Sequence, residues 1–195
     1  MSKNTNQLIK ARCYWITGLS ASGKTTMVNM LTNYLKKKNK PVIQLDGDIL
    51  RNVFNAKVYS LEERYKLGLK FSALCKLIVE NDVNVAIGVI GLFHKLHSWN
   101  RENIPNYCEI FLNVPEEELI DRDPKGIYKK ALKGEIKNVM GIDLKVEFPL
   151  KPDIEIRWVK NKNIEDTFKE IVEKIKTLSN VVSKTERFDE IKKKY

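Results

Sequence analysis

The sequence feature that most constrains the fold is a glycine-bounded loop at residues 18–25, which reads GLSASGKT. It fits the pattern G-x-x-x-x-G-K-[ST], whose glycines let the backbone turn so that successive N–H groups converge on a phosphate. Residues 13–17 before the loop are apolar and β-prone, and residues 26–35 after it carry apolar side chains at helical spacing. Because strand, glycine loop and helix are the context that the motif requires, we predict a phosphate-binding loop at a helix N-terminus.

The residue types in this loop predict how a nucleotide would be held. Loop N–H groups would face the phosphates of ATP, Lys24 would reach the β- and γ-phosphates, and Thr25 would hold Mg²⁺. The predicted contacts with ATP are Gly18, Leu19, Ser20, Ala21, Ser22, Gly23, Lys24, Thr25 and Thr26. A chance glycine turn is the alternative, and the flanking strand and helix argue against it.

Strand and helix patterns alternate along the rest of the chain. Further strands are expected at 42–45, 83–90, 107–114 and 154–156, and long helices at 61–81 and 164–178. The segment 83–90 is the most apolar, so we expect it to be the central strand. Alternating strands and helices form a parallel sheet with helices on both faces. We therefore predict a P-loop NTPase fold, a three-layer α/β/α domain over residues 1–195 with a five-stranded parallel sheet, a basic lid and a charged C-terminal tail at 180–195.

Composition limits the classes to which the chain can belong. Its 195 residues, 43% hydrophobic and 31% charged, suit one soluble domain with a single core. The sequence has no run of 18 apolar residues, and residues 1–12 lack the apolar segment of a secretory signal, so we expect a cytoplasmic protein without a membrane partner. Cys13, Cys75 and Cys108 are scattered in apolar stretches, which is typical of reduced core residues.

The net charge of +10 is compatible with two kinds of partner, nucleic acid and small phosphate-rich substrates. The chain has no recognised nucleic-acid-binding module and no clear row of exposed aromatic residues. We therefore expect a small nucleotide substrate and no nucleic acid. The sequence leaves the oligomeric state open, with a homodimer as one outcome.

Two carboxylates, Asp46 and Asp48, follow the second expected strand. The carboxyl end of that strand lies on the same sheet edge as the phosphate loop, where a carboxylate can orient Mg²⁺ or accept a proton from an attacking hydroxyl. A turn with a helix N-cap at Asp48 is the structural alternative. Because the apolar strand 83–90 does not end on an aspartate, we assign the metal and base duties to Asp46 and Asp48 without deciding between them.

A basic segment at 122–143 follows the fourth expected strand. It contains Arg122, Lys125 and four further lysines, and three glycines interrupt it. We predict a mobile lid rather than packed core, whose charges close over the nucleotide phosphates and exclude water. A solvated basic helix is the alternative.

His94 and His97 lie before this segment, three residues apart. No third ligand is evident near them, which favours a surface or substrate-facing role over a metal site.

Three stretches together resemble the adenylylsulfate kinase family, over about residues 12–178. WITGLSASGKTT at 15–26 is similar to the family's phosphate loop, and LDGD at 45–48 with Arg51 is similar to its second motif. RDPKGIYKKA at 122–131, with the GEIKN and GID that follow, resembles its lid and is the most specific of the three. The resemblance implies a kinase that transfers the γ-phosphoryl group of MgATP to the ribose 3′-hydroxyl of adenosine 5′-phosphosulfate.

The resemblance also implies acceptor-binding residues. Arg51 and Arg64 match the family's clamps, and their guanidinium forks suit an anionic group on the acceptor's 5′ side. Arg122 and Lys125 would lie over the donor as the lid closes. The other acceptor-side positions carried over are Asp46, Tyr59, Ile90, His94, Lys125 and Val139.

Among the positions that depart from the family pattern, four bear on the acceptor or on the phosphorylated serine of some members. Leu67 stands where the family has an asparagine, and Gly91 where some members carry a phosphorylated serine. His94 replaces an arginine, and Val139 replaces an aromatic residue that helps to stack the acceptor adenine. Phosphate handling therefore matches the family, whereas the base pocket differs.

These departures leave three hypotheses. Adenylylsulfate is the nominal acceptor of an ATP-dependent phosphotransferase. A cytidine diphosphate conjugate is the alternative, because relatives in capsule phosphoramidate biosynthesis phosphorylate cytidine diphosphoramidate. A catalytically inactive nucleotide-binding regulator is the alternative of another class, against which the intact Lys24, Thr25, Asp46 and Asp48 argue.

Overall fold

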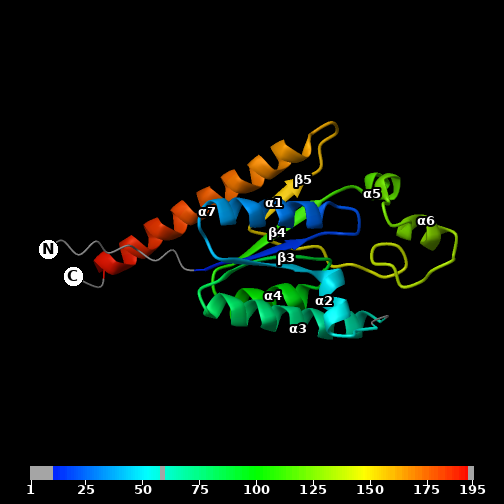
Figure 1. Cartoon of the computed structure of the whole chain (residues 1–195), viewed down its shortest axis with the longest axis horizontal. Helices are drawn as coiled ribbons and strands as arrows, with labels where there is room; N and C mark the ends of the chain where they lie inside the picture. The colour runs from blue at the N-terminus through cyan, green and yellow to red at the C-terminus, as the bar shows by residue number, and fades with distance from the viewer. Residues whose placement is uncertain (1–10, 58–59, 193–195) are drawn as a thin grey trace.

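The computed structural model describes residues 11–57 and 60–192. Five strands pair in parallel in the order β2-β3-β1-β4-β5 (Figure 1). Their bounds are Cys13–Thr17 for β1, Val42–Asp46 for β2, Asn84–Val89 for β3, Tyr107–Asn113 for β4 and Ile154–Arg157 for β5. The predicted five-stranded parallel sheet is confirmed.

The middle strand is β1, so the expectation that segment 83–90 forms the centre of the sheet is wrong. Every residue of β3 is nevertheless buried, because β3 lies between β2 and β1. An apolar run reports burial on both faces of a sheet, and any interior strand has that property. The pattern therefore identifies an interior strand without placing it in the order.

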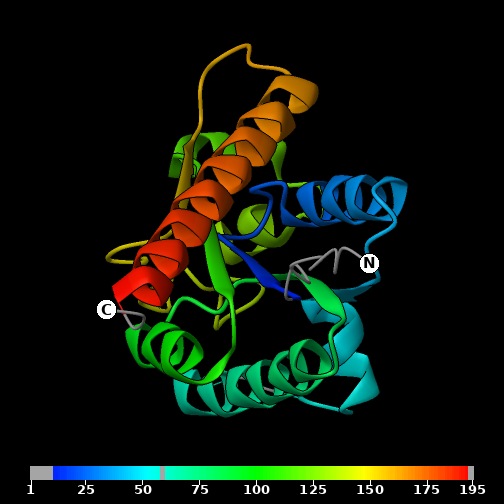
Figure 2. The same cartoon turned by 90° about the vertical axis from the view of Figure 1, so that its left-hand side faces the viewer.

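Four long helices form the outer layers (Figure 2). Helices α1, Lys24–Lys37, and α7, Ile164–Lys192, pack on one face, and α3, Leu61–Glu80, and α4, His94–Asn103, pack on the other. Successive side chains of β1 alternate between the two core clusters, with Tyr14 and Ile16 toward α1 and Trp15 toward α3. The three cysteines are buried and free, as predicted.

Helix α7 continues well beyond the expected end at residue 178, so residues 180–192 do not form a separate tail. The apolar stripe marked only the part of this helix that packs on the sheet, and a helix can continue past such a stripe. Within the described ranges, no helix combines the length and the apolar character needed to cross a membrane.

Three short helices gather at the end of the sheet where the strands terminate (Figure 1). They are α2, Gly47–Val53, α5, Glu116–Arg122, and α6, Ile127–Leu132. In parallel α/β sheets, ligands bind in the crevice outside the carboxyl ends of the strands. The fold therefore brings the glycine loop after β1, the carboxylates after β2 and the basic segment after α5 to one edge.

Candidate active site

The glycine loop joins β1 to α1, as the motif predicts. Gly23 adopts a φ of +93° immediately before α1 begins at Lys24. At Gly18 an added Cβ would come within 2.9 Å of the Leu112 carbonyl oxygen, so a larger residue does not fit there. Among the described residues, no side chain caps the N-terminus of α1. The first N–H groups of this helix and its partial positive charge therefore suit a phosphate.

Lys24 is folded back into the loop. Its Nζ donates to the Leu19 carbonyl oxygen at 2.6 Å and lies 3.5 Å from Ser22 Oγ. Burial, assisted by the nearby charge of Lys125 and opposed by Asp46, lowers the pKa of Lys24 to about 7. Lys24 therefore rests on a backbone carbonyl in a setting that favours its neutral form unless an anion arrives.

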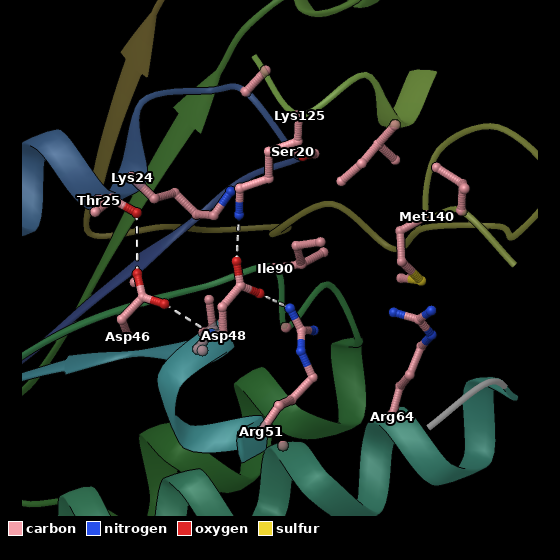
Figure 3. A pocket seen from close by; sticks show the side chains of 18 of the residues that line it. Ser20, Lys24, Thr25, Asp46, Asp48, Arg51, Arg64, Ile90, Lys125 and Met140 are labelled. Carbon is pink, nitrogen blue, oxygen red and sulfur yellow. Dashed lines mark hydrogen bonds and ion pairs between the residues drawn. The ribbon is translucent and has the colours of Figure 1, made fainter. Parts of the chain in front are cut away.

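Asp46, the last residue of β2, connects this strand to the phosphate loop. Its Oδ2 accepts a hydrogen bond from Thr25 Oγ1 at 3.1 Å, and its Oδ1 accepts from the Asp48 N–H at 2.8 Å (Figure 3). Asp46 is thus the N-cap of α2, and the suggested cap at Asp48 is wrong. The reason is that β2 keeps the extended backbone as far as Asp46, and a cap side chain bonds the N–H groups two and three residues ahead.

Asp48 has different partners. Its carboxylate pairs with Arg51 on α2 and with Lys125, which reaches across from the basic segment (Figure 3). The structure therefore separates the two carboxylates, with Asp46 beside Thr25 and Asp48 beside two cations. It also brings Lys125 to the site although 77 residues separate it from Asp48.

These groups line one cavity of about 1190 Å³. Of the residues predicted for the site, the cavity is lined by Ser20, Ala21, Gly23, Lys24, Thr25, Thr26, Asp46, Asp48, Arg51, Arg64, Ile90, Arg122, Lys125 and Val139. Gly18, Leu19 and Ser22 belong to the loop but do not line the cavity. Tyr59 lies outside the described residues.

Arg64 lies on the far side of the cavity from Lys24, on helix α3 (Figure 3). Its Nη2 donates to the Asn138 carbonyl oxygen at 2.8 Å, and burial lowers the pKa of Arg64 and of Arg51. The neighbouring Val139 is only 9% exposed. Arg64 therefore rests on the loop that contains Val139, which is one of the departures from the family pattern.

The two histidines differ in their surroundings, and neither is among the described residues that line the cavity. His94 is not among the described residues that line the cavity, and its Nε2 lies 2.9 Å from the Phe148 carbonyl oxygen. His97 is 6% exposed, so the expected surface or substrate-facing position is wrong for it. It lies 2.8 Å from the Gly91 carbonyl oxygen, and burial lowers the pKa of its imidazole to about 4. Histidine at an amphipathic helix position is as often buried and bonded as exposed, and the sequence pattern does not distinguish the two.

The basic segment 122–143 is packed more firmly than predicted. Tyr128 is fully buried and donates from its hydroxyl to the Ser20 carbonyl oxygen at 3.1 Å. Met140 joins Leu19 and Leu92 in a buried cluster. The expectation of a segment outside the packed core is therefore wrong for Tyr128 and Met140. Glycines break their periodicity, so they pack singly without producing a recognisable stripe.

Some lining residues were not predicted as site residues, namely Trp15, Lys57, Phe71, Phe93 and Lys137. Trp15 and Phe71 have the apolar character of core residues, so no sequence pattern distinguishes them as lining the site. Lys57 lies close in sequence to the acceptor motif, and Lys137 is one of the lysines of the basic segment whose charges were expected to close over the phosphates, so these positions carried the available signal.

The fold and the site define a P-loop phosphotransferase, because a lysine in a glycine loop, a threonine facing a carboxylate and a set of cations surround one cavity. The family model for adenylylsulphate kinase matches residues 10–157. The chain therefore belongs to the adenylylsulphate kinase family and is an ATP-dependent kinase of this type.

Individual relatives are consistent with this assignment. The chain is 37% identical over 161 residues to a cytidine diphosphoramidate kinase from Campylobacter jejuni, covering 83% of this chain and 94% of the relative. It is 36% identical over 160 residues to an adenylyl-sulfate kinase from Halothermothrix orenii, covering 82% and 86%. The solved Mycobacterium tuberculosis APS kinase CysC, in complex with AMPPNP and APS, superimposes with a TM-score of 0.79 at 28% identity, covering 86% and 98%.

Proposed function

We propose that this kinase transfers the γ-phosphoryl group of ATP to the ribose 3′-hydroxyl of a small nucleotide that carries an anionic 5′ group. One observation carries the proposal: a single cavity has the phosphate loop with Lys24 on one side, Arg51 and Arg64 on the other, and Asp48 between them. A donor phosphate and an anionic acceptor can therefore be held face to face. Adenylylsulfate is the acceptor of the family and the first candidate.

On the donor side, the oxygen atoms beside the loop fit a magnesium ion. Thr25 Oγ1 and Asp46 Oδ2 lie 3.1 Å apart, and hydroxyl and carboxylate oxygens are the ligands that Mg²⁺ takes. In our proposal these two residues hold Mg²⁺, which neutralises charge on the donor phosphates when bound. Lys24, Arg122 and Lys125 take the remaining phosphate charge.

On the acceptor side, Asp48 is our candidate for the group that accepts the hydroxyl proton. Its carboxylate is held by Arg51 and Lys125, two cations that phosphate oxygens attract. Movement of these cations onto the substrates would free a carboxylate oxygen at the centre of the cavity. Arg51 and Arg64 would then hold the 5′ group of the acceptor.

A second candidate acceptor is a cytidine diphosphate conjugate such as cytidine diphosphoramidate. The observation that favours it is that Leu67, Gly91 and Val139, three departures from the family pattern, all line the cavity. A relative at 37% identity is named for this activity. Replacing a hydrogen-bonding asparagine and an aromatic face by aliphatic side chains removes contacts that discriminate adenine.

The proposal is tested with γ-labelled ATP and a panel of acceptors that includes adenylylsulfate, cytidine diphosphoramidate and unmodified nucleotides. The expected result is label on the 3′ position of one of the first two acceptors, with Lys24→Ala as the inactive control. If neither acceptor is labelled at ATP concentrations that saturate the protein, the proposal is refuted.

We also propose a cytoplasmic location, where ATP and nucleotide conjugates are found. We further propose a homodimer, which sedimentation velocity would test.

A further inference from the structure

The cavity has an apolar end, and the proposed reaction names no residue there that contacts the acceptor's base. It lies beside α3 and is lined by Trp15, Leu67, Gly68, Phe71, Phe93 and Val139. These side chains offer one polar group, the indole N–H of Trp15, which is buried and has no hydrogen-bond partner among the described residues. A nucleobase has broad apolar faces, so this end matches a base better than it matches a phosphate or a sugar.

Phe93 is the aromatic side chain at this end whose ring a ligand can reach. Trp15 is fully buried and Phe71 is 5% exposed, whereas Phe93 is half-buried. Phe93 lies in the loop between β3 and α4, directly before the first residue of α4. Of the aromatic lining residues that the structure describes, it is therefore the one with ring surface available.

The ring of Phe93 is held in place from the side away from the cavity. Tyr65 packs against it edge to face, with ring centroids 6.0 Å apart and an interplanar angle of 68°. Tyr65 itself does not line the cavity among the described residues. An aromatic surface fixed before the ligand arrives costs little conformational entropy on binding.

The backbone around Phe93 is fixed as well. Glu147 donates its N–H to the Leu92 carbonyl oxygen at 3.1 Å, and its carboxylate accepts from the His94 N–H at 2.7 Å. The Phe93 side chain cannot cap α4, so Glu147 caps this helix from a distant segment of the chain. His97, bonded to the Gly91 carbonyl oxygen, holds the other end of the loop.

The place of Phe93 also suits the geometry of a nucleotide. Arg64 and Tyr65 are consecutive on α3, and the Arg64 guanidinium points toward Met140 across the cavity (Figure 3). Arg64 and Phe93 line the same cavity, so a nucleotide with its 5′ group on Arg64 can extend along it and place its base at the apolar end. Val139, which lines the same end, offers an aliphatic surface and no π-face.

From these observations we infer that Phe93 is the aromatic surface against which the acceptor's base packs. The inference rests on the proposed function, since it takes the acceptor to be a nucleotide. It makes Phe93 a specificity-determining residue, and it places the base against the β3–α4 loop rather than against the lid residue at position 139.

The test compares acceptor binding in the parent and in Phe93→Leu, with the donor site filled by a nonhydrolysable ATP analogue. Cytidine 5′-diphosphate and adenosine 5′-phosphosulfate are the nucleotide probes, and ribose 5-phosphate is the probe without a base. Loss of a base–aromatic stack should weaken nucleotide binding about 5- to 150-fold. Binding of ribose 5-phosphate and of the ATP analogue should change less than about twofold, because neither uses the ring.

Two further variants serve as controls. Phe93→Tyr keeps the ring and should bind nucleotides like the parent. Phe71→Leu removes a lining aromatic residue that is already covered, so it should lower the melting temperature without a selective loss of nucleotide binding. If Phe93→Leu does not fold, Phe93→Met, which is also apolar and unbranched at Cβ, replaces it.

The outcomes separate the inference from the proposed function. Transfer by the parent with equal acceptor KM in Phe93→Leu would overturn the base contact and leave the kinase reaction standing. Nucleotide binding that depends on Phe93, without transfer to any acceptor, would overturn the reaction and support the contact. A parent that binds no nucleotide beside the ATP analogue would overturn both.

Discussion

At the scale of single residues, the cations of the site rest on oxygen atoms of the protein. Lys24 donates to the Leu19 carbonyl, Arg64 donates to the Asn138 carbonyl, and Lys125 pairs with Asp48. Phosphate oxygens are stronger partners for these cations than a backbone carbonyl is. Substrate binding can therefore give each of these cations a phosphate oxygen in place of the protein oxygen that it now contacts.

Lys24 carries the first prediction. Lys24→Ala should keep the fold and lose on the order of 10²–10³ in turnover, because the lysine stabilises charge that moves between donor and acceptor. The measurement is steady-state transfer to the preferred acceptor, with circular dichroism as the folding control. Turnover within about threefold of the parent would contradict the phosphate-loop mechanism, since that ratio is below about 1 kcal/mol.

The lowered pKa of Lys24 leads to a second prediction, on pH. Below pH 7, Lys24 is already protonated in the free protein, because burial places its pKa at about 7. Bound phosphates favour the charged form, so above that pH ATP binding must take up a proton, and affinity should fall by up to about tenfold per pH unit. The dissociation constant for ATP from pH 6 to pH 9 tests this.

Lys24→Met is the control for the pH measurement. Methionine has a similar length and no titrating group, so the variant shows the pH dependence that ATP alone contributes. A parent profile that runs parallel to that of the variant would contradict the assignment to Lys24.

The two carboxylates give a third prediction. Asp46 accepts a hydrogen bond from Thr25, whereas Asp48 pairs with cations. Replacing each aspartate by asparagine should therefore change different kinetic parameters. Asp46→Asn should raise the Mg²⁺ concentration needed for half-maximal rate, whereas Asp48→Asn should lower kcat on the order of 10²-fold with ATP affinity unchanged. If both variants turn over normally and only melt earlier, the pair has a structural role.

At the scale of elements, the sequence was sufficient where local chemistry determines conformation. The strand, glycine loop and helix around Lys24 were predicted because the glycines and the apolar periodicity lie within one short stretch. The order of the strands in the sheet was not predicted, because the burial of β3 shows only that it has a strand on each side and not where it lies in the order. The packing of Tyr128 and Met140 was also missed, since single apolar residues between glycines leave no period.

The same limit applies to the site. Motif residues such as Asp46, Asp48 and Arg51 line the cavity, because they lie at the end of β2 and on the short helix α2 that follows it. Phe93 was missed, and His94, beside it, was chosen instead. Only the fold shows that the ring of Phe93 faces the cavity while the His94 imidazole turns to Phe148.

The apolar end of the cavity gives a fourth prediction, between two elements. Leu67 on α3 and Val139 in the loop held by Asp143 both line it. The double change Leu67→Asn with Val139→Phe restores the family's residues at these two positions, so it should lower KM for adenylylsulfate. A new base–aromatic stack would contribute roughly 1–3 kcal/mol to the binding free energy of this acceptor. Kinetics with adenylylsulfate and cytidine diphosphoramidate on parent and double variant are the measurement. Efficient use of adenylylsulfate by the parent, with none of the cytidine conjugate, would contradict the altered base pocket.

At the scale of the whole molecule, the sheet separates two hydrophobic clusters while its carboxyl edge stays open to ligands. Helices α1 and α7 close one face and α3 and α4 the other, so the edge is lined from both layers and from the basic segment. In the proposed reaction, donor and acceptor share one cavity, and Lys125 bridges to Asp48 across it. Ligands in this cavity therefore contact segments of the chain that contribute to different hydrophobic clusters. Their binding should raise the free energy of unfolding of the whole domain.

That reasoning gives a fifth prediction, on thermal unfolding. A ligand at about 100 times its dissociation constant stabilises the folded state by about 2.7 kcal/mol. For a chain of this size each kcal/mol raises Tm by about 2–4 °C, so MgATP should raise it by about 5–11 °C. The acceptor with a nonhydrolysable analogue should add a further increase, because it fills the rest of the same cavity. Differential scanning calorimetry measures these shifts, with Lys24→Met as the variant in which the donor shift is reduced. An acceptor shift that is the same with and without the analogue would show independent sites, and an acceptor that gives no shift in either case would contradict the shared cavity as its binding site.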